Sequence, residues 1–292
     1  MPSLKEIRTR IASIKSTRQI TSAMKMVAAS RLRKVQNNIV FLREYANTLK
    51  YILGDVMLRL PPSYQNVFLK QRSNKHVLII AIGSDKGLCG TYNSLLIKRT
   101  LQEIYAQQDS GNKVSLLPFG KKPANFFHKR GFNILPDIDP HFDKVSYDFA
   151  VQFADLVAEK YLKGNFERVL IVYNRFKNAV VHELTTEQLL PVSEEDLMTV
   201  ADDDDERTDD PVILEPQPEE VIDYMTRQYI NYNVYRILLD ASASEHGSRM
   251  TAMHKATDNA DELLKSLTLS YNKARQASVT RELLDIVGGA ER

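Results

Sequence analysis

The chain has 292 residues, of which 43% are hydrophobic and 26% are charged, and its formal net charge at pH 7 is +2. This composition is ordinary for a soluble protein and leaves room for a packed domain together with further structure. The longest apolar run, Val77 to Ile82, is far shorter than the roughly 18–20 residues that cross a bilayer, so we expect no direct membrane span. Cys89 is the only cysteine, which excludes an intrachain disulfide and a zinc site built from several thiolates.

Helix-breaking residues are nearly absent from both ends of the chain. Between residues 3 and 60 there is no proline and the only glycine is Gly54; from residue 219 onward there is no proline and only three glycines. Two very long helices are therefore predicted, each roughly 75–100 Å long at about 1.5 Å per residue. Helices of this length cannot fold into one compact core, so they must pair with each other or with another protein.

The N-terminal stretch has apolar residues at the 3–4 spacing of a helix that packs at a shallow angle on another helix. The predicted seam contains Leu4, Ile7, Ile11, Ile14, Ala28, Leu32, Val35, Ile39, Leu42, Ala46 and Leu49. Between its two blocks the seam positions are Arg18, Thr21 and Lys25, while Ile20, Met24 and Val27 form an apolar face beside them. This displacement predicts a local change of partner or of supercoil.

The C-terminal stretch repeats the pattern, and its proline-rich start suits the beginning of a helix. Pro216 and Pro218 precede two acidic residues, which the helix dipole favours at an N-terminus. The predicted seam contains Ile230, Val234, Ile237, Ala241, Met253, Ala256, Ala260, Leu264, Leu267, Tyr271 and Ala274. We expect an antiparallel coiled coil of the two chain ends; the alternative is two separate helices folded onto a globular core.

The middle of the chain predicts a compact α/β domain with a mainly parallel, Rossmann-like sheet covered on both faces. Strands are expected at 76–82, 113–118, 168–174 and 180–184, and helices at 91–108, 122–129 and 146–162. The predicted fold class is therefore α/β with a long antiparallel coiled coil. The predicted parts are an N-terminal helix (1–60), the α/β domain (75–192), an acidic exposed loop (193–218) and a C-terminal helix (219–287) that pairs with residues 1–60.

Charge is distributed unevenly along the chain. Residues 1–34 contain nine Lys and Arg against Glu6 alone, which indicates an acidic partner, either a protein surface or nucleic acid. The stretch lacks the interleaved aromatic residues that would favour nucleic acid. The run DDDDERTDD (Asp202 to Asp210) resists compaction and predicts an exposed loop.

Motifs for catalysis or cofactor binding are weak. Gly83, Gly87 and Gly90 follow a predicted strand but match neither dinucleotide-binding nor P-loop spacing, so a tight structural turn is favoured over a nucleotide site. The six histidines are scattered, and Cys89 is expected to be a small buried residue at a helix start rather than a nucleophile. No catalytic, cofactor or metal site is predicted.

Three segments carry more specific patterns. They are RIASIKSTRQITSAMKMVAASRLRKVQ (Arg10 to Gln36), SDKGLCG (Ser84 to Gly90), and the stretch from ASEHGSRM to DIVGGA (Ala243 to Ala290). All three resemble, in the same order, signatures of the gamma subunit of F-type (proton-translocating) ATP synthases. The resemblance extends over most of the chain and is weakest between about Gln107 and Ile213.

The resemblance implies a non-catalytic subunit that forms the central rotating stalk of the ATP synthase. It implies that the terminal coiled coil lies inside a ring of alpha and beta subunits, and that the α/β domain stands beside the epsilon subunit on the c-subunit ring. Rotation driven by proton flow would then change the conformations of the catalytic beta subunits. No cofactor and no nucleic acid are implied, and the location would be peripheral, on the cytoplasmic face of a bacterial inner membrane. The alternatives are a nucleotide-binding α/β enzyme and a basic coiled-coil protein that binds nucleic acid.

The motif match also assigns contact residues. Those predicted to meet the alpha/beta ring are Met24 and Lys25 in ITSAMK, Arg275 and Gln276 in KARQAS, and Thr280 and Glu282 in VTRELL; Glu215 in ILEP is assigned to the c-ring foot. Met24 has the alternative role of a seam residue. Ser22 stands where the family commonly has lysine, so one basic contact to the ring is expected to be missing.

Overall fold

The computed structural model describes residues 3–58, 64, 66–73, 75–135, 145–193, 215 and 217–290. The chain divides into two compact units. Unit 1 is formed by residues 1–30 and 249–292, and unit 2 by residues 31–248. Two long helices, α1 (Leu4–Leu58) and α6 (Pro218–Ala290), contribute residues to both units, so the prediction of a long helix at each end of the chain is confirmed.

Unit 2 contains a four-stranded sheet in the order β2-β1-β3-β4. The central strand β1 (His76–Ile82) pairs in parallel with β2 (Lys113–Phe119) and with β3 (Arg168–Phe176), and β4 (His182–Leu190) is antiparallel to β3. The predicted mainly parallel sheet is confirmed. The last strand predicted at 180–184 is present as β4, but its predicted bounds are wrong: it runs from His182 to Leu190. It begins after Val181 because the Oδ1 atom of Asn178 accepts hydrogen bonds from the backbone N–H groups of Val180 and Val181.

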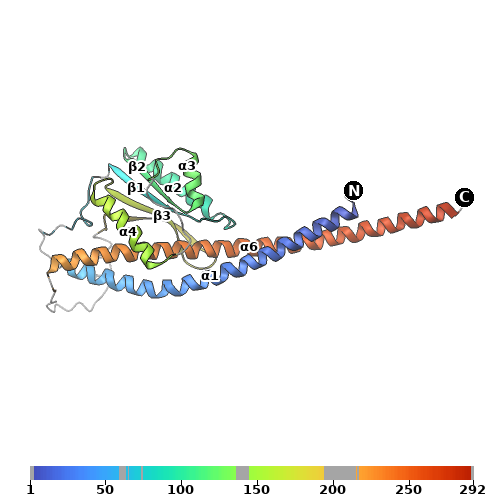
Figure 1. The fold of residues 1–292 in the computed structure, drawn as a ribbon, viewed down its shortest axis with the longest axis horizontal. Helices are drawn as coiled ribbons and strands as arrows, with labels where there is room; N and C mark the ends of the chain where they lie inside the picture. The colour runs from blue at the N-terminus through green and yellow to red at the C-terminus, as the bar shows by residue number, and fades with distance from the viewer. Residues whose placement is uncertain are drawn as a thin grey trace. The chain divides into compact units, whose positions relative to one another are not determined.

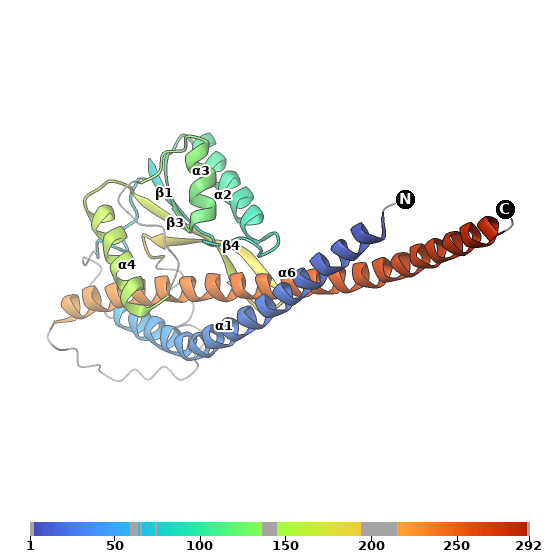
Figure 2. The same ribbon diagram turned by 45° about the vertical axis from the view of Figure 1, so that its right-hand side comes forward.

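Helices cover both faces of this sheet, as Figures 1 and 2 show. On one face, Val77 and Ile79 pack with residues of α2 (Tyr92–Asp109) and α3 (Lys121–Lys129). On the other face, Leu78 and Ile80 share a core with α4 (Tyr147–Leu162) and with the parts of α1 and α6 that belong to unit 2. Alternate residues of one buried strand therefore feed two separate cores, as the period of two in a strand requires.

In unit 1, residues 4–30 of α1 and 249–290 of α6 form an antiparallel pair. Contacts fall to lower numbers on α6 as they rise on α1: Arg8 meets Tyr271, Arg18 meets Asp261 and Thr21 meets Thr257. Buried or half-buried positions recur with the predicted spacing at Ile7, Ile11, Ile14, Thr21, Ala28, Met253, Ala256, Ala260, Leu264, Leu267, Tyr271 and Ala274. The predicted antiparallel coiled-coil seam is confirmed in this unit.

The predicted local change of supercoil near Thr21 is not found, because the seam continues through Thr21; the alternative, a local change of partner, stays a prediction. Thr21 is only 8% exposed, whereas Ile20 and Val27 are 59% and 55% exposed. The seam keeps its register because the Thr21 hydroxyl finds a polar partner on α6, and the apolar face of Ile20 and Val27 points to solvent.

A buried ion network joins β3, β4 and α6 within unit 2. The Arg236 guanidinium donates to Glu187 Oε2 at 2.6 Å and to the Tyr173 hydroxyl at 3.2 Å, and Arg175 also donates to Glu187. Burial raises the pKa of Glu187, but the charge of Arg236 and the hydrogen bonds from Tyr173, Arg236 and Arg175 outweigh burial and hold that pKa below its usual range. Burial also raises the pKa of Tyr173 to about 12.

We expect Glu187→Gln to destabilise the protein at neutral pH by about 3 kcal/mol, because it leaves the charge of Arg236 without its closest partner. Since the folded pKa of Glu187 is lowered, its contribution is present above the unfolded pKa of about 4.3 and is lost as the pH falls through the folded pKa. Urea unfolding of wild type and variant should therefore converge in acid. Glu183→Gln removes an exposed pair with Lys177 and should have little effect; equal losses for both variants would contradict the role of the buried network.

A second expectation concerns Gly247, where α6 passes close to the turn between β3 and β4. A Cβ atom at this position would lie 2.9 Å from the carbonyl oxygen of Ala179. Alanine favours a helix by about 1 kcal/mol over glycine, but overpacking costs about 1–3 kcal/mol. Gly247→Ala should lower the thermal unfolding midpoint, whereas Thr48→Ala, on an exposed position of α1, should not. A Gly247→Ala variant more stable than wild type would contradict this expectation, because it would show that the turn at Ala179 moves aside at little cost.

Candidate interaction surface of the terminal helices

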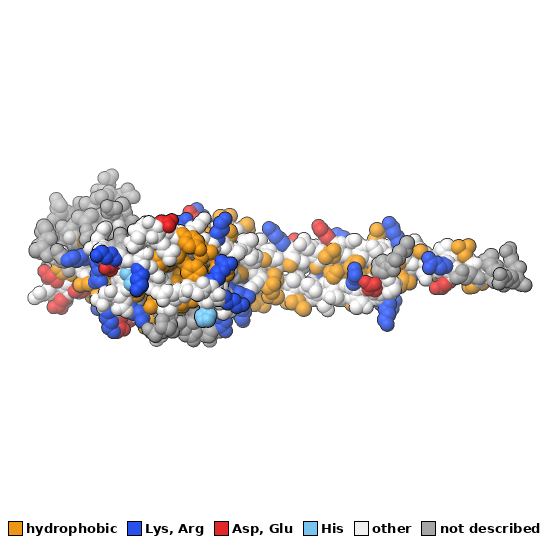
Figure 3. Space-filling model, turned by 90° about the horizontal axis from the view of Figure 1, so that it is seen from above, with side chains coloured by type: hydrophobic (Ala, Val, Ile, Leu, Met, Phe, Trp, Pro, Cys, Tyr) orange, Lys and Arg blue, Asp and Glu red, His pale blue; other side chains and the backbone are white. Residues whose placement is uncertain are grey.

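The predicted contact residues of α1 lie beside exposed apolar side chains in unit 1. Lys25 is a half-buried seam position and Met24 is half-buried beside it, whereas Ile20, Met26 and Val27 are exposed. Met24 therefore lies at the margin of the helix pair, reachable from outside. In the space-filling view, hydrophobic side chains lie among Lys and Arg on the surface of the two-helix part (Figure 3).

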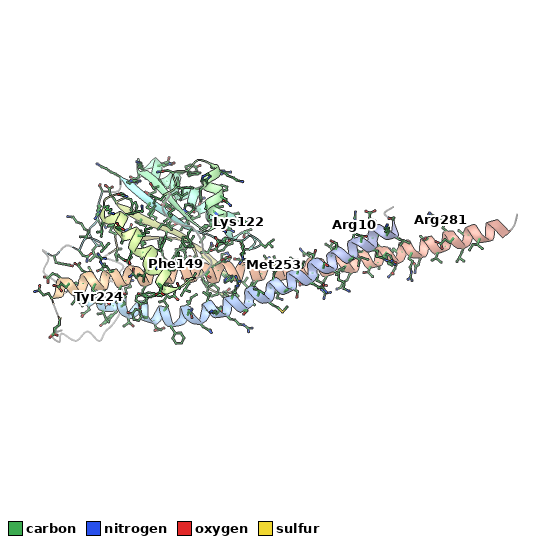
Figure 4. All side chains as sticks on the ribbon, in the orientation of Figure 1. Arg10, Lys122, Phe149, Tyr224, Met253 and Arg281 are labelled. Carbon is green, nitrogen blue, oxygen red and sulfur yellow. The ribbon has the colours of Figure 1, made fainter. Side chains whose placement is uncertain are left out.

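The predicted contact residues of α6 lie where that helix has passed the end of α1. The contact of Arg8 with Tyr271 places the start of α1 near residue 275, and Arg275, Gln276, Thr280 and Glu282 are all exposed. Arg281 projects from the same turns (Figure 4). Glu282 accepts a hydrogen bond from the Ser278 hydroxyl at 3.3 Å, so its carboxylate stays on the outer surface of the helix.

These last turns also expose large apolar side chains that sequence reasoning did not single out. Val279, Leu283, Leu284 and Ile286 are 49%, 57%, 65% and 68% exposed. An exposed run of this kind marks a surface that another protein covers. The signal was present in the sequence, since these residues follow the last seam position and have no counterpart on the N-terminal helix.

Polar contacts hold the two helices of unit 1 in one register. The Thr257 hydroxyl contacts the Thr21 oxygen at 2.9 Å, and the Thr21 hydroxyl donates to the backbone oxygen of Arg18 at 3.0 Å. Arg18 in turn pairs with Asp261 at 3.1 Å between half-exposed side chains. Sequence reasoning placed Thr21 on the seam but missed its partner, because a heptad pattern does not say which residues face each other.

The glycine-containing turn after β1 is filled by its own side chains. Ser84 is fully buried; its backbone N–H donates to Asn93 Oδ1 at 3.0 Å, and its hydroxyl accepts from Asn93 Nδ2 at 2.7 Å. A Cβ atom on Gly83 would lie 2.7 Å from Pro123, so little space is left for a phosphate group. The predicted structural turn is confirmed, and Cys89 is buried just before α2 as expected.

Little can be said of two other predicted features. Glu215 is exposed, and the acidic run 202–210 lies outside the described residues. Across the described ranges, no helix is both long enough and apolar enough to cross a membrane. In the same ranges, no three His, Cys, Asp or Glu side chains are grouped so that they could hold a metal ion.

Comparison with known proteins identifies the family. The family model described as ATP synthase matches residues 3–292. The chain is 42% identical over 294 residues to the ATP synthase gamma chain of Chlorobium phaeobacteroides (strain DSM 266 / SMG 266 / 2430), covering 100% of this chain and 99% of that one. The gamma chain of Cytophaga hutchinsonii gives the same identity and coverage. The chain belongs to the ATP synthase gamma chain family.

Chains of solved ATP synthase structures are also similar. A chain of the Tetrahymena thermophila mitochondrial ATP synthase central stalk and c-ring structure has 28% identity and a TM-score of 0.59, over 81% of this chain and 99% of that one. A chain of the Euglena gracilis mitochondrial ATP synthase has a TM-score of 0.67 over 99% of this chain and 93% of that one. At 24% identity, the second likeness supports the fold alone.

The contact between Thr21 and Thr257 can be measured with a double-mutant cycle. Thr257→Val should destabilise the helix pair by about 1 kcal/mol, because the Thr21 hydroxyl loses its hydrogen-bond partner on α6. Adding Thr21→Val should cost less than its separate effect, giving a coupling of about 0.5–1 kcal/mol in far-UV circular dichroism melts. Thr17→Val, which removes an exposed hydroxyl bonded only to Ser13 along the helix, is the matched control; zero coupling would contradict the contact.

Proposed function

We propose that this chain is the rotating shaft of an F-type ATP synthase and couples c-ring rotation to conformational change at the catalytic beta subunits. It is a non-catalytic subunit of the complex. The proposed contacts with the alpha/beta ring are Met24 and Lys25 on α1, and Arg275, Gln276, Thr280 and Glu282 on α6.

The exposed last turns of α6 carry this proposal. Leu283, Leu284 and Ile286 project beyond the end of α1, where no described residue covers them. Burying an exposed leucine or isoleucine side chain gains about 1.5–3 kcal/mol, so this surface favours enclosure by other subunits. The polar residues among them, Arg275 and Glu282, supply contacts that depend on orientation.

The proposed mechanism is mechanical and allosteric, because a gamma chain is a non-catalytic subunit of the complex. A shaft with different side chains on its different sides presents different contacts to each of the surrounding subunits. A contact that favours one conformation of a beta subunit over another shifts the populations of the two, and only this differential affinity does work on the site. Turning the shaft then changes which subunit is favoured.

The remaining assignments follow from the same proposal. The four-part division of the chain places the α/β domain at 75–192 and the acidic exposed loop at 193–218, between the terminal helices 1–60 and 219–287. We place Glu215 at the c-ring foot, with the epsilon subunit as a neighbour of the α/β domain. The proposed location is the cytoplasmic face of the bacterial inner membrane, where the complex would use a proton gradient.

Reconstitution with purified alpha and beta subunits tests the shaft role. The wild-type chain should form a stable complex with them and raise ATP hydrolysis markedly above that of alpha and beta alone. The double variant Arg275→Ala/Gln276→Ala should lower this turnover by about tenfold, since coupling free energies are typically 1–3 kcal/mol. The helicity of the isolated variant should not change, because both side chains are exposed.

The matched control is Asn272→Ala/Lys273→Ala, on adjacent exposed positions of α6 in the stretch that still lies alongside α1. This control should keep wild-type turnover if the ring contacts the part of α6 that lies beyond the end of α1. Equal loss in both double variants would place the contact elsewhere on the helix. A chain that neither co-purifies with alpha and beta nor changes their turnover would overturn the shaft proposal itself.

A further inference from the structure

A polar cleft lies beside the edge strand of unit 2. Its volume is about 840 Å³, within the roughly 300–1,000 Å³ typical of ligand sites. Its lining includes Lys50 of α1, Arg175 of β3, Lys177 directly after β3, and residues 186–188 of β4. Tyr229 and Tyr232 of α6 add aromatic surface. Nothing in the shaft function described above uses this cleft.

The backbone of β4 makes the cleft suitable for an extended chain. In the sheet order β2-β1-β3-β4, strand β4 pairs with β3 on one side, and no strand among the described residues pairs with its other edge. An edge strand points the N–H and C=O groups of alternate residues outward, where they can pair with another strand. Since residues 186–188 line the cleft, a segment lying in it is within reach of these groups.

The charge of the cleft favours an acidic occupant. Its lining carries four cationic side chains and two carboxylates, Glu187 and Asp240, and both carboxylates lie against Arg236, at 2.6 and 3.6 Å. Arg175 is 42% exposed and contacts its neighbours through Nε and Nη2, which leaves the Nη1 hydrogens outside these bonds. Lys177, also in the lining, pairs with Glu183 at 2.9 Å, so Lys50 and Arg175 are the cationic side chains best placed for an acidic occupant.

We propose that this cleft binds an extended acidic segment of a partner protein by strand addition to β4. Main-chain hydrogen bonds to the edge of β4 supply affinity, and the acidic side chains of the segment meet Lys50 and Arg175. A small anion would use the charges but leave the strand edge unpaired, and an apolar segment would leave the basic side chains unpaired. Both features together select an acidic chain in the extended conformation.

Fluorescence anisotropy with the full-length chain tests this proposal. The probe is a labelled peptide of 9 residues, the length of β4, with alternating glutamate and valine. A second peptide has the same sequence with every peptide nitrogen methylated, which keeps the charge but removes all N–H donors. A third alternates lysine and valine. The first peptide should bind at least about tenfold more tightly than either of the others, a difference of about 1.4 kcal/mol.

A charge reversal on α1 gives the corresponding test on the protein. Lys50→Glu should weaken binding of the glutamate peptide by about tenfold or more without disturbing the network of Arg236, which Lys50 does not contact. Lys98→Glu, at an exposed position of α2, is the matched control. Equal binding of the N-methylated peptide, or no effect of Lys50→Glu, would overturn the proposal.

The chain's own acidic run, Asp202 to Asp210, is the competing occupant. If the wild-type chain binds no peptide but a variant with these aspartates changed to asparagine does, the cleft belongs to that run and the proposed partner is overturned. Because every measurement uses the isolated chain, its outcome is independent of whether the chain activates alpha and beta subunits.

Discussion

Antiparallel pairing of the two chain ends is the constraint on which unit 1 depends. Its two helices have only each other to cover their seams, and the seam is narrow: Ile7, Ala28, Met253 and Ala260 are buried, while most other seam positions are half-buried. Alanine at several of these positions contributes little apolar area but permits close approach of the two backbones. The pair is therefore held by many shallow contacts and a few polar ones, of which the contact of Thr21 with Thr257 is the most buried.

The same helix α6 meets a different partner in unit 2, and its sequence changes accordingly. Six of the eight residues 241–248 are Ala, Ser or Gly; Ser244 donates to the backbone oxygen of Asn174, and Gly247 allows the close approach of the turn at Ala179. Here the helix lies against a sheet and a hairpin, where bulky seam residues would not fit. One uninterrupted helix thus carries two kinds of packing surface, and neither requires a break in its backbone hydrogen bonding.

Most of the fold could be predicted because its signals are local. Long stretches without proline, the 3–4 spacing and the apolar run of β1 specify helix or strand from neighbouring residues alone. What sequence reasoning missed depends on contacts that local patterns do not specify. Thr21 is polar on an apolar seam, and only its contact with Thr257 on α6 explains it. The start of β4 is set by the hydrogen bonds that the Asn178 side chain accepts in the preceding turn. The predicted contact residues Arg275 and Gln276 came from motif resemblance, since no periodicity distinguishes an exposed polar pair that binds a partner from one that binds water.

The composition of the exposed end of α6 also bears on how a shaft can work. An interface that is broken and remade as the shaft turns cannot be as apolar as a permanent one, because each release would cost the full burial energy of its leucines. The exposed end of α6 has instead a mixed surface, with Leu283 and Ile286 among Arg275, Thr280 and Glu282. Its apolar part can pack against any neighbour, whereas its polar part distinguishes one orientation from another. Under the proposed function, the polar contacts that distinguish one orientation from another are the part of this surface that couples rotation to the state of the surrounding sites.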